Sequence, residues 1–215
     1  MKKVIIIDYK LGNLFSVLQA CKTVGIDAEI SSEVEKIKAA DALILPGVGA
    51  FAEAMQNLNS LNLAQTIIEE VKNGKPIFGI CLGQQLLLTE SEEFENCKGL
   101  NLIEGRIIKF SNLINNKKVK VPQVGWNQIL QPENINWEKT PFSSIFAKDY
   151  MYFVHSYYTE VKETEYILAN TDYCDFIYAS AILKDNIFST QFHPEKSGEK
   201  GLSIYRNWAK LNNLI

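Results

Sequence analysis

A cysteine flanked by glycines, in the segment Gly79-Ile80-Cys81-Leu82-Gly83, is the feature that most constrains how this 215-residue chain can fold. The apolar run 75–80 predicts a short core strand, and the run 84–88 predicts the start of a helix. A strand that turns at once into a helix displays the residue at the turn above the sheet, and nearby backbone N–H groups can stabilise an oxyanion. The segment therefore predicts Cys81 as a nucleophile at the carboxyl end of a strand.

A cysteine nucleophile needs a base or a positive charge beside it, because a free thiol with a pKa of about 8.5 is mostly protonated at neutral pH. The chain has only two histidines, His155 and His193, and each of them ends an expected strand. Strand position alone therefore leaves both open as the base. Glu195 follows His193 by two residues and can orient its imidazole, so we expect a triad of Cys81, His193 and Glu195.

Short apolar runs alternate with amphipathic stretches through the first half of the chain, which is typical of α/β proteins. We expect a mostly parallel sheet flanked by helices, with strands near 4–7, 28–30, 42–45 and 75–80 and helices near 13–24 and 63–73. Shorter alternating strands are expected as antiparallel additions to the same sheet at 106–110, 123–129, 150–154, 166–169, 176–183 and 187–191, before a last helix near 201–211. The length suits one core, and no linker or repeat interrupts it, so we expect a single domain spanning residues 1–215.

The composition argues against several classes of protein. A net charge of −3 and the lack of a basic stripe give no reason to expect nucleic-acid binding. The apolar run that starts at Val4 is too short for a signal peptide or a membrane-spanning helix. The four cysteines are far apart and form no C-x-x-C pair, so neither a zinc site nor a disulfide framework is indicated. We therefore expect a cytoplasmic protein that uses no metal or other cofactor.

A second glycine-rich loop, Gly47-Val48-Gly49, follows the expected strand 42–45. The carboxyl ends of parallel strands lie at one edge of a sheet, so this loop should emerge beside Cys81. Its N–H groups, together with that of Leu82, can form a two-donor oxyanion site. Glycine also lets a peptide flip at low cost, which makes the loop a candidate gate.

In this order the segments resemble the class I, triad-type glutamine amidotransferases, and most closely the glutaminase subunits of imidazole glycerol phosphate synthase. The matching segments extend over nearly the whole chain, at 8–14, 45–51, 79–85, 121–127, 152–158 and 191–197. The resemblance implies the class I amidotransferase fold. It also implies that Cys81 attacks the carboxamide of glutamine, that His193 carries the proton to the departing ammonia, and that Glu195 orients His193.

The resemblance further assigns contacts to the substrate glutamine. Gln85 matches a substrate-binding glutamine, and Glu93 matches the carboxylate that holds the substrate amino group, although Glu90 and Glu92 stand close enough to keep that position open. The remaining expected contacts are backbone groups of the elbow, the glycine-rich loop and a later strand end, at Gly49, Leu82, Ser156 and Tyr157.

Released ammonia would be protonated and lost to solvent, so a partner that consumes it is expected. The resemblance implies a (β/α)₈ barrel cyclase that makes imidazole glycerol phosphate in histidine biosynthesis. Trp126 resembles an interface aromatic, although a place in the core is equally open from the sequence. Gln123 lies in the same docking segment, and Lys196 is expected near the ammonia entrance.

Two residues depart from the family pattern. Lys10 stands where the family often has glycine, and Gln123 stands where histidine is expected before the Gly-Trp pair. The second departure keeps an alternative open, namely a related amidotransferase that supplies ammonia to a barrel partner for amination or amidination of a cell-surface sugar. A regulatory module with an idle triad and a thiol peptidase are disfavoured, because the triad and the glutamine-pocket segments are all present.

Overall fold

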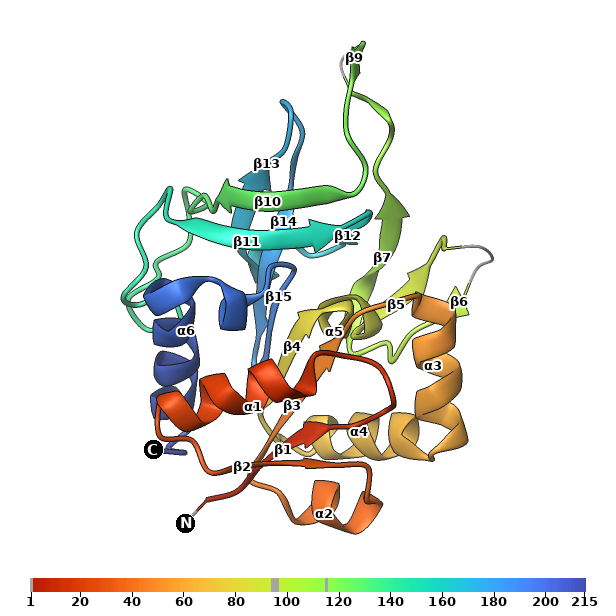
Figure 1. The fold of residues 1–215 in the computed structure, drawn as a ribbon, viewed down its shortest axis with the longest axis vertical. Helices are drawn as coiled ribbons and strands as arrows, with labels where there is room; N and C mark the ends of the chain where they lie inside the picture. The colour runs from red at the N-terminus through yellow and green to blue at the C-terminus, as the bar shows by residue number, and fades with distance from the viewer. Residues whose placement is uncertain (1, 94–96, 115) are drawn as a thin grey trace.

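The computed structural model describes residues 2–93, 97–114 and 116–215. In these residues eleven strands form one sheet in the order β2-β1-β3-β4-β15-β14-β12-β7-β5-β6, with β13 beside β14 (Figure 1). Its strands are β1 Val4–Ile7, β2 Ala28–Ser31, β3 Ala42–Gly47, β4 Ile77–Cys81, β5 Leu88–Ser91, β6 Cys97–Lys98, β7 Ile103–Lys109, β12 Tyr157–Val161, β13 Ile167–Asp172, β14 Ile177–Lys184 and β15 Ile187–Thr190. The helices are α1 Leu14–Thr23, α2 Val34–Ala39, α3 Phe51–Ser60, α4 Leu63–Lys72, α5 Leu82–Leu86 and α6 Gly198–Leu211, with 3-10 turns at Thr164–Tyr166 and Pro194–Lys196.

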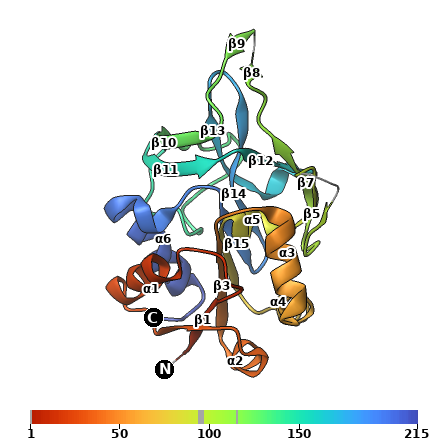
Figure 2. The same ribbon diagram turned by 45° about the vertical axis from the view of Figure 1, so that its right-hand side comes forward.

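The helices cover both faces of the sheet because its central strands are apolar on both sides. In β1, Val4 and Ile6 belong to one core cluster and Ile5 and Ile7 to the other. The first cluster takes side chains from α1 and α6, and the second takes them from α2, α3 and α4. Figure 2 shows these two sets of helices on opposite sides of the strands. The expected fold, a mostly parallel sheet flanked by helices with antiparallel additions, is confirmed.

The parallel strands bring the two glycine-containing segments to one edge of the sheet. Gly47, at the end of β3, is the register partner of Cys81, at the end of β4. On the other side of β4, Thr190 of β15 pairs with Ile80. The residue after Thr190 therefore emerges beside Cys81, opposite the glycine-rich loop.

Two expected strands do not join the main sheet. β10 (Gln123–Gln128) and β11 (Tyr150–His155) pair with each other as a separate antiparallel ribbon that runs across the sheet (Figure 1). The outer edge of β11 is occupied, because the carbonyl of Tyr152 accepts from the His193 N–H at 2.9 Å and its N–H donates to the Ser197 hydroxyl at 3.0 Å. The expectation that both strands extend the main sheet is therefore corrected.

β15 was also expected to be antiparallel, and this is correct only toward β14, since β15 runs parallel to β4. Helices α2 and α3 and strands β5, β6 and β12 were not predicted from the sequence. A small hairpin of β8 (Leu113–Ile114) and β9 (Lys117–Lys118) was also unforeseen. No helix in the described residues is long and apolar enough to cross a membrane.

Candidate active site

Cys81 occupies a strained turn between β4 and α5. Its backbone has φ 56° and ψ −109°, outside the regions that residues with a side chain ordinarily adopt. A Cβ on Gly83 would lie 1.7 Å from the carbonyl oxygen of Leu45, and one on Gly79 would lie 2.8 Å from Leu87 Cδ1. The two glycines therefore let α5 start directly against the sheet and hold Cys81 at its edge.

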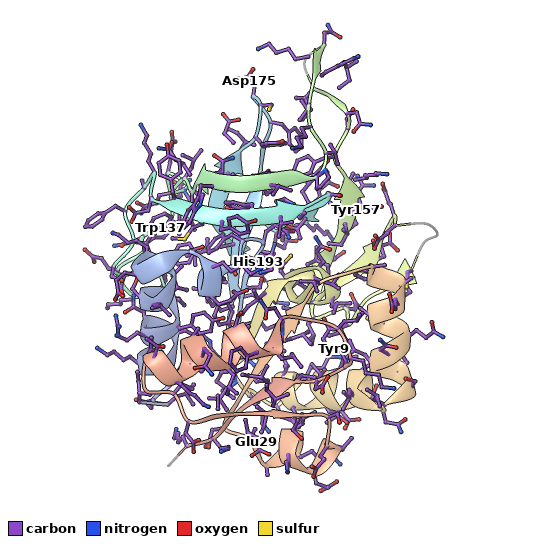
Figure 3. All side chains as sticks on the ribbon, viewed as in Figure 1. Tyr9, Glu29, Trp137, Tyr157, Asp175 and His193 are labelled. Carbon is purple, nitrogen blue, oxygen red and sulfur yellow. The ribbon has the colours of Figure 1, made fainter. Side chains whose placement is uncertain are left out.

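His193 and Glu195 complete a buried line of polar groups behind Cys81. The His193 Nδ1 lies 2.8 Å from Glu195 Oε1, and the two side chains are 3% and 1% exposed. The Cys81 sulfur acts electrostatically on the His193 ring, and the buried Nε2 has no hydrogen-bond partner among the described residues. Burial opposes a charge on the ring, but the negative charges of Cys81 and Glu195 outweigh it and raise the pKa of His193. The imidazole is therefore held in its protonated form beside the sulfur (Figure 3 labels His193).

His155 is placed differently, although it also ends a strand. Its Nδ1 lies 2.8 Å from the carbonyl of Tyr157, so Nδ1 carries the hydrogen, and Nε2 lies 3.1 Å from the hydroxyl of Tyr178. Burial lowers the pKa of His155 to about 4. Both ring nitrogens are engaged and the ring is neutral, so the geometry favours His193 as the base.

A cleft of about 310 Å³ opens in front of Cys81. Every residue that the sequence analysis expected to contact substrate lines it. The lining consists of Val48, Gly49, Cys81, Leu82, Gln85, Glu93, Pro122, Val154, His155, Ser156 and Tyr157. Pro122 and Val154 were not foreseen as lining residues, because they reach the cleft through the β10–β11 ribbon, whose position the sequence did not reveal.

Among the three neighbouring glutamates, Glu93 is the one that faces the cleft. Glu90 pairs with Lys98 at 2.6 Å, and Glu92 lies 3.6 Å from Arg106. Both of these pairs lie outside the cleft lining. Glu93 is thus the one of the three carboxylates that lines the cleft.

The glycine-rich loop begins at the register partner of Cys81, and a hydrogen bond from Tyr9 holds the residue before it. The buried Tyr9 hydroxyl donates to the carbonyl of Pro46 at 2.7 Å, and a Cβ on Gly47 would lie 2.1 Å from that hydroxyl oxygen. Gly49 has φ 109°, which disfavours any residue with a side chain. The loop therefore has a fixed root and a free glycine hinge, and its gating stays a prediction.

Lys10 has φ 69°. This left-handed conformation favours glycine and is consistent with the glycine that related sequences were expected to carry there. The Lys10 N–H donates to Asp8 Oδ1 at 2.9 Å, a local bond that helps to hold the turn. The departure from the family pattern is thus accommodated in the backbone, away from the cleft.

Gln191 is a buried residue of the site that the sequence analysis did not single out. Its Nε2 lies 3.7 Å from Cys81 Sγ, and its Oε1 accepts from Gln85 Nε2 at 3.0 Å. The signal was present in the sequence: strand alternation puts Gln191 on the same side as His193, two residues later.

The outer face of the β10–β11 ribbon carries an exposed aromatic cluster. Trp126 is 56% exposed, and its ring meets that of Tyr152 edge-on at 6.1 Å between centroids. Lys196 Nζ lies 6.0 Å from the centre of the Tyr152 ring. The alternative of a buried Trp126 is thereby excluded for this chain on its own.

Gln123 lies on the inner face of the same ribbon. It is 2% exposed, and its Oε1 is 3.0 Å from the hydroxyl of Tyr178. Adjacent residues of a strand point to opposite faces, so Gln123 and Trp126 cannot share one surface. The expectation that the Gln123 side chain lies at a partner interface is corrected accordingly.

The described part of the chain holds no group of three or more His, Cys, Asp or Glu side chains that could bind a metal ion. All four cysteines are free thiols. What the site offers chemically is a cysteine, a protonated imidazole, a carboxylate and backbone donors beside a cleft of small-molecule size. This set suits attack on an acyl carbon followed by proton transfer to a leaving group.

Solved structures share this fold at low sequence identity. The PurLQS structure from Thermotoga maritima matches with a TM-score of 0.73 at 18% identity, covering 97% of this chain and 98% of that one. The glutaminase domain of Trypanosoma brucei CTPS matches with a TM-score of 0.62 at 19% identity, covering 98% and 94%.

Sequence comparisons identify the family. Residues 5–210 match the family model for class-I glutamine amidotransferases. Imidazole glycerol phosphate synthase subunit HisH of Methanosarcina mazei is 45% identical over 98% of this chain and all of its own length. The subunit of the same name from Geobacter sulfurreducens is 40% identical with the same coverage of both chains. The resemblance drawn from the sequence is confirmed: the chain belongs to the class-I glutamine amidotransferases and, among them, to the family of HisH subunits.

Proposed function

We propose that this chain hydrolyses glutamine to glutamate and ammonia, and that it does so as the glutaminase subunit of an imidazole glycerol phosphate synthase in histidine biosynthesis. One observation carries the proposal: His193 lies between Glu195 and Cys81, which lines the cleft, in a chain 45% identical to a HisH subunit.

In the proposed reaction the thiolate of Cys81 attacks the side-chain carbonyl carbon of glutamine, with its proton held by His193. The tetrahedral intermediate collapses, the C–N bond breaks, and the protonated imidazole gives its proton to the departing ammonia. Water then attacks the thioester, His193 accepts a proton from it, and glutamate leaves while the thiol is restored. Glu195 keeps Nδ1 of the imidazole hydrogen-bonded throughout, so that Nε2 stays directed at the sulfur.

The oxyanion of the intermediate would be met by backbone N–H groups of Leu82 and of the Gly47–Gly49 loop, which line the same cleft or begin beside it. Glu93 would bind the amino group of the substrate. Gln85, Ser156 and Tyr157 would complete the pocket, since all three line it. No step requires a metal or a cofactor.

Ammonia released at Cys81 would be consumed by a barrel-shaped cyclase that docks on the outer face of the β10–β11 ribbon. The exposed cluster of Trp126, Tyr152 and Lys196 supports this surface, because aromatic residues are enriched at protein interfaces. The free thiols and this chemistry suit a reducing cytoplasm.

The alternative acceptor, a cell-surface sugar, rested on the departure at Gln123. Because Gln123 is buried and bonded to Tyr178, its identity carries no information about the docking surface. No other feature of the described residues favours that acceptor.

The test is coupled turnover by the purified chain together with a barrel cyclase from the same genome. We expect imidazole glycerol phosphate to form from glutamine in the wild type and not in Cys81→Ala, while added ammonium salt restores the product with Cys81→Ala. Cys97→Ala serves as the matched control, since Cys97 lies on β6 outside the cleft lining. Glutamine hydrolysis without the cyclase product would refute the acceptor, and unchanged hydrolysis in Cys81→Ala would refute the nucleophile.

A further inference from the structure

The amide of Gln191 is held in one orientation by its neighbours. Gln85 Nε2 lies 3.3 Å from the carbonyl of Tyr157, which can only accept, so this atom of Gln85 is the nitrogen. The atom of Gln191 that meets Gln85 Nε2 at 3.0 Å must therefore be the oxygen. The Gln191 nitrogen is consequently the atom directed at Cys81 Sγ, 3.7 Å away. The backbone fixes the residue as well, since the Gln191 N–H donates to Ser180 O at 2.8 Å.

Two polar groups lie next to the Cys81 sulfur, and they favour opposite charge states of it. The carbonyl of Val154 lies 3.9 Å from Sγ and can be met only by a protonated thiol. The N–H group of Gln191 can donate to the sulfur and is attracted more strongly once the sulfur is a thiolate. The Gln191 side chain is fully buried, and that of Cys81 is 6% exposed. Gln191 is thus a fixed neutral donor that favours the thiolate over the thiol.

We infer that Gln191 is a positioning residue that donates a hydrogen bond to the Cys81 thiolate, with Gln85 fixing the orientation of its amide. The inference rests on the proposed role of Cys81 as the nucleophile. Gln85 lines the cleft and contacts Gln191, whereas Gln191 does not line the cleft. Gln191 therefore connects the side chain of Gln85 to the thiol of Cys81 from behind the cleft wall. A change at Gln85 should therefore reach the reactivity of Cys81 even when no glutamine is bound.

Other titratable groups face Cys81 from the elements packed around it. His193 approaches it from the turn after β15, Tyr9 from the segment after β1 and Tyr178 from β14. Burial raises the pKa of both phenols, so they stay neutral over the ordinary range. Glu195 acts from behind His193, and Glu93 shares the cleft lining. Gln191 carries no charge itself, so its replacement by leucine changes the environment of the sulfur without adding a titratable group.

The experiment measures the alkylation rate of Cys81 by iodoacetamide, in which the thiolate sulfur displaces iodide, from pH 5 to pH 10. Mass spectrometry of the Cys81 peptide separates it from the other three cysteines. In Gln191→Leu we expect the midpoint of the profile to rise by about one pH unit, which is about a tenfold lower rate at pH values below both midpoints. In Gln191→Glu, which keeps the shape but replaces the donor by an acceptor, the rise should be larger.

Gln84→Leu is the matched control. Gln84 is equally buried and stands on α5, but its Nε2 donates to the Thr159 hydroxyl at 3.2 Å and makes no contact with the sulfur. Gln84→Leu should leave the Cys81 profile unchanged. An unchanged midpoint in Gln191→Leu, or an equal rise in Gln84→Leu, would overturn the inference. Thermal unfolding of each variant confirms that the measurements are made on folded protein.

A double-substitution cycle tests the role assigned to Gln85. Gln85→Leu should raise the midpoint less than Gln191→Leu, and the double variant should match Gln191→Leu alone, because Gln85 acts through Gln191. Additive effects would overturn that part of the inference. Failure of the proposed function would give a different result from failure of the inference. The wild-type complex would then release no glutamate from glutamine, whatever the alkylation profiles.

Discussion

Glu93 Oε2 accepts a hydrogen bond from the backbone N–H of Phe51 at 2.5 Å, at the first residue of α3. The same carboxylate lines the cleft beside Gly49. It therefore joins the proposed binding place of the substrate amino group to the helix that follows the glycine-rich loop. A substrate ammonium group that drew the Glu93 carboxylate away from Phe51 would release the first residue of α3. The glycine-rich loop that precedes α3 would then be free to move.

Glu93→Gln removes the charge but keeps an oxygen that can accept from Phe51 N–H. We expect KM for glutamine to rise about 10- to 100-fold, because a charge-assisted bond to the substrate ammonium is lost. The value of kcat should change much less. Steady-state glutaminase kinetics give both numbers. Glu92→Gln is the control, since Glu92 pairs with Arg106 outside the cleft; an equal rise in KM there would contradict the assignment of Glu93.

Glu195→Gln removes the carboxylate that holds His193, and we expect kcat to fall about 100-fold or more. Cys81 and Glu195 together raise the pKa of His193 in the folded chain, so these two contacts stabilise the fold fully below the unfolded pKa of about 6.5. This contribution is lost as the pH rises through the folded pKa of about 10.

The difference in free energy of unfolding between wild type and Glu195→Gln should therefore be larger at pH 6 than at pH 10.5. Denaturant titration at the two values measures it. Glu199→Gln, which removes an exposed carboxylate 3.5 Å from Arg206, is the control and should show no such trend. A difference that grows with pH would contradict the assigned His193–Glu195 pair.

His193 and Glu195 also illustrate which parts of the site could be predicted from the sequence. The elbow glycines and the nearby Glu195, together with the family resemblance, were enough to propose Cys81, His193 and Glu195, because strand ends and turn residues are local signals. The contacts of Gln191 and the burial of Gln123 depend on which strands become neighbours, which one sequence does not state. The β10–β11 ribbon was misplaced for the same reason: its alternation predicts two strands but not the hydrogen bonds between Tyr152 and the segment after β15. β5 and β12 escaped notice because their apolar residues do not stand out from the surrounding sequence.

Gly83→Ala should be strongly destabilising, although alanine is the better helix former. Its Cβ would lie 1.7 Å from Leu45 O, so α5 must move away from β3. We expect a loss of about 3 kcal/mol or failure to fold, as for other overpacked sites. Gly74→Ala is the comparison, because its φ of 93° is unfavourable but nothing lies within 4 Å of the added carbon. Its loss should be about 1 kcal/mol, and equal losses by denaturant titration would contradict the steric explanation.

Trp126→Ala should leave the stability of the isolated chain nearly unchanged, since the side chain is 56% exposed. Its affinity for the barrel partner should fall at least about 30-fold, as for aromatic residues at the centre of an interface. Titration calorimetry with the purified cyclase measures the affinity. Leu211→Ala, at the end of α6 and 49% exposed, is the control for a lost apolar surface residue. Unchanged affinity in Trp126→Ala would place the docking surface elsewhere.

The backbone of Cys81, at φ 56° and ψ −109°, has a consequence for how this chain can lose its activity. Alanine at position 81 keeps the unfavourable conformation, whereas glycine relieves it, which suggests a gain of about 1 kcal/mol or more for Cys81→Gly over Cys81→Ala. Any residue with a side chain at this position therefore carries a backbone cost that serves the display of the thiol and not the stability of the elbow.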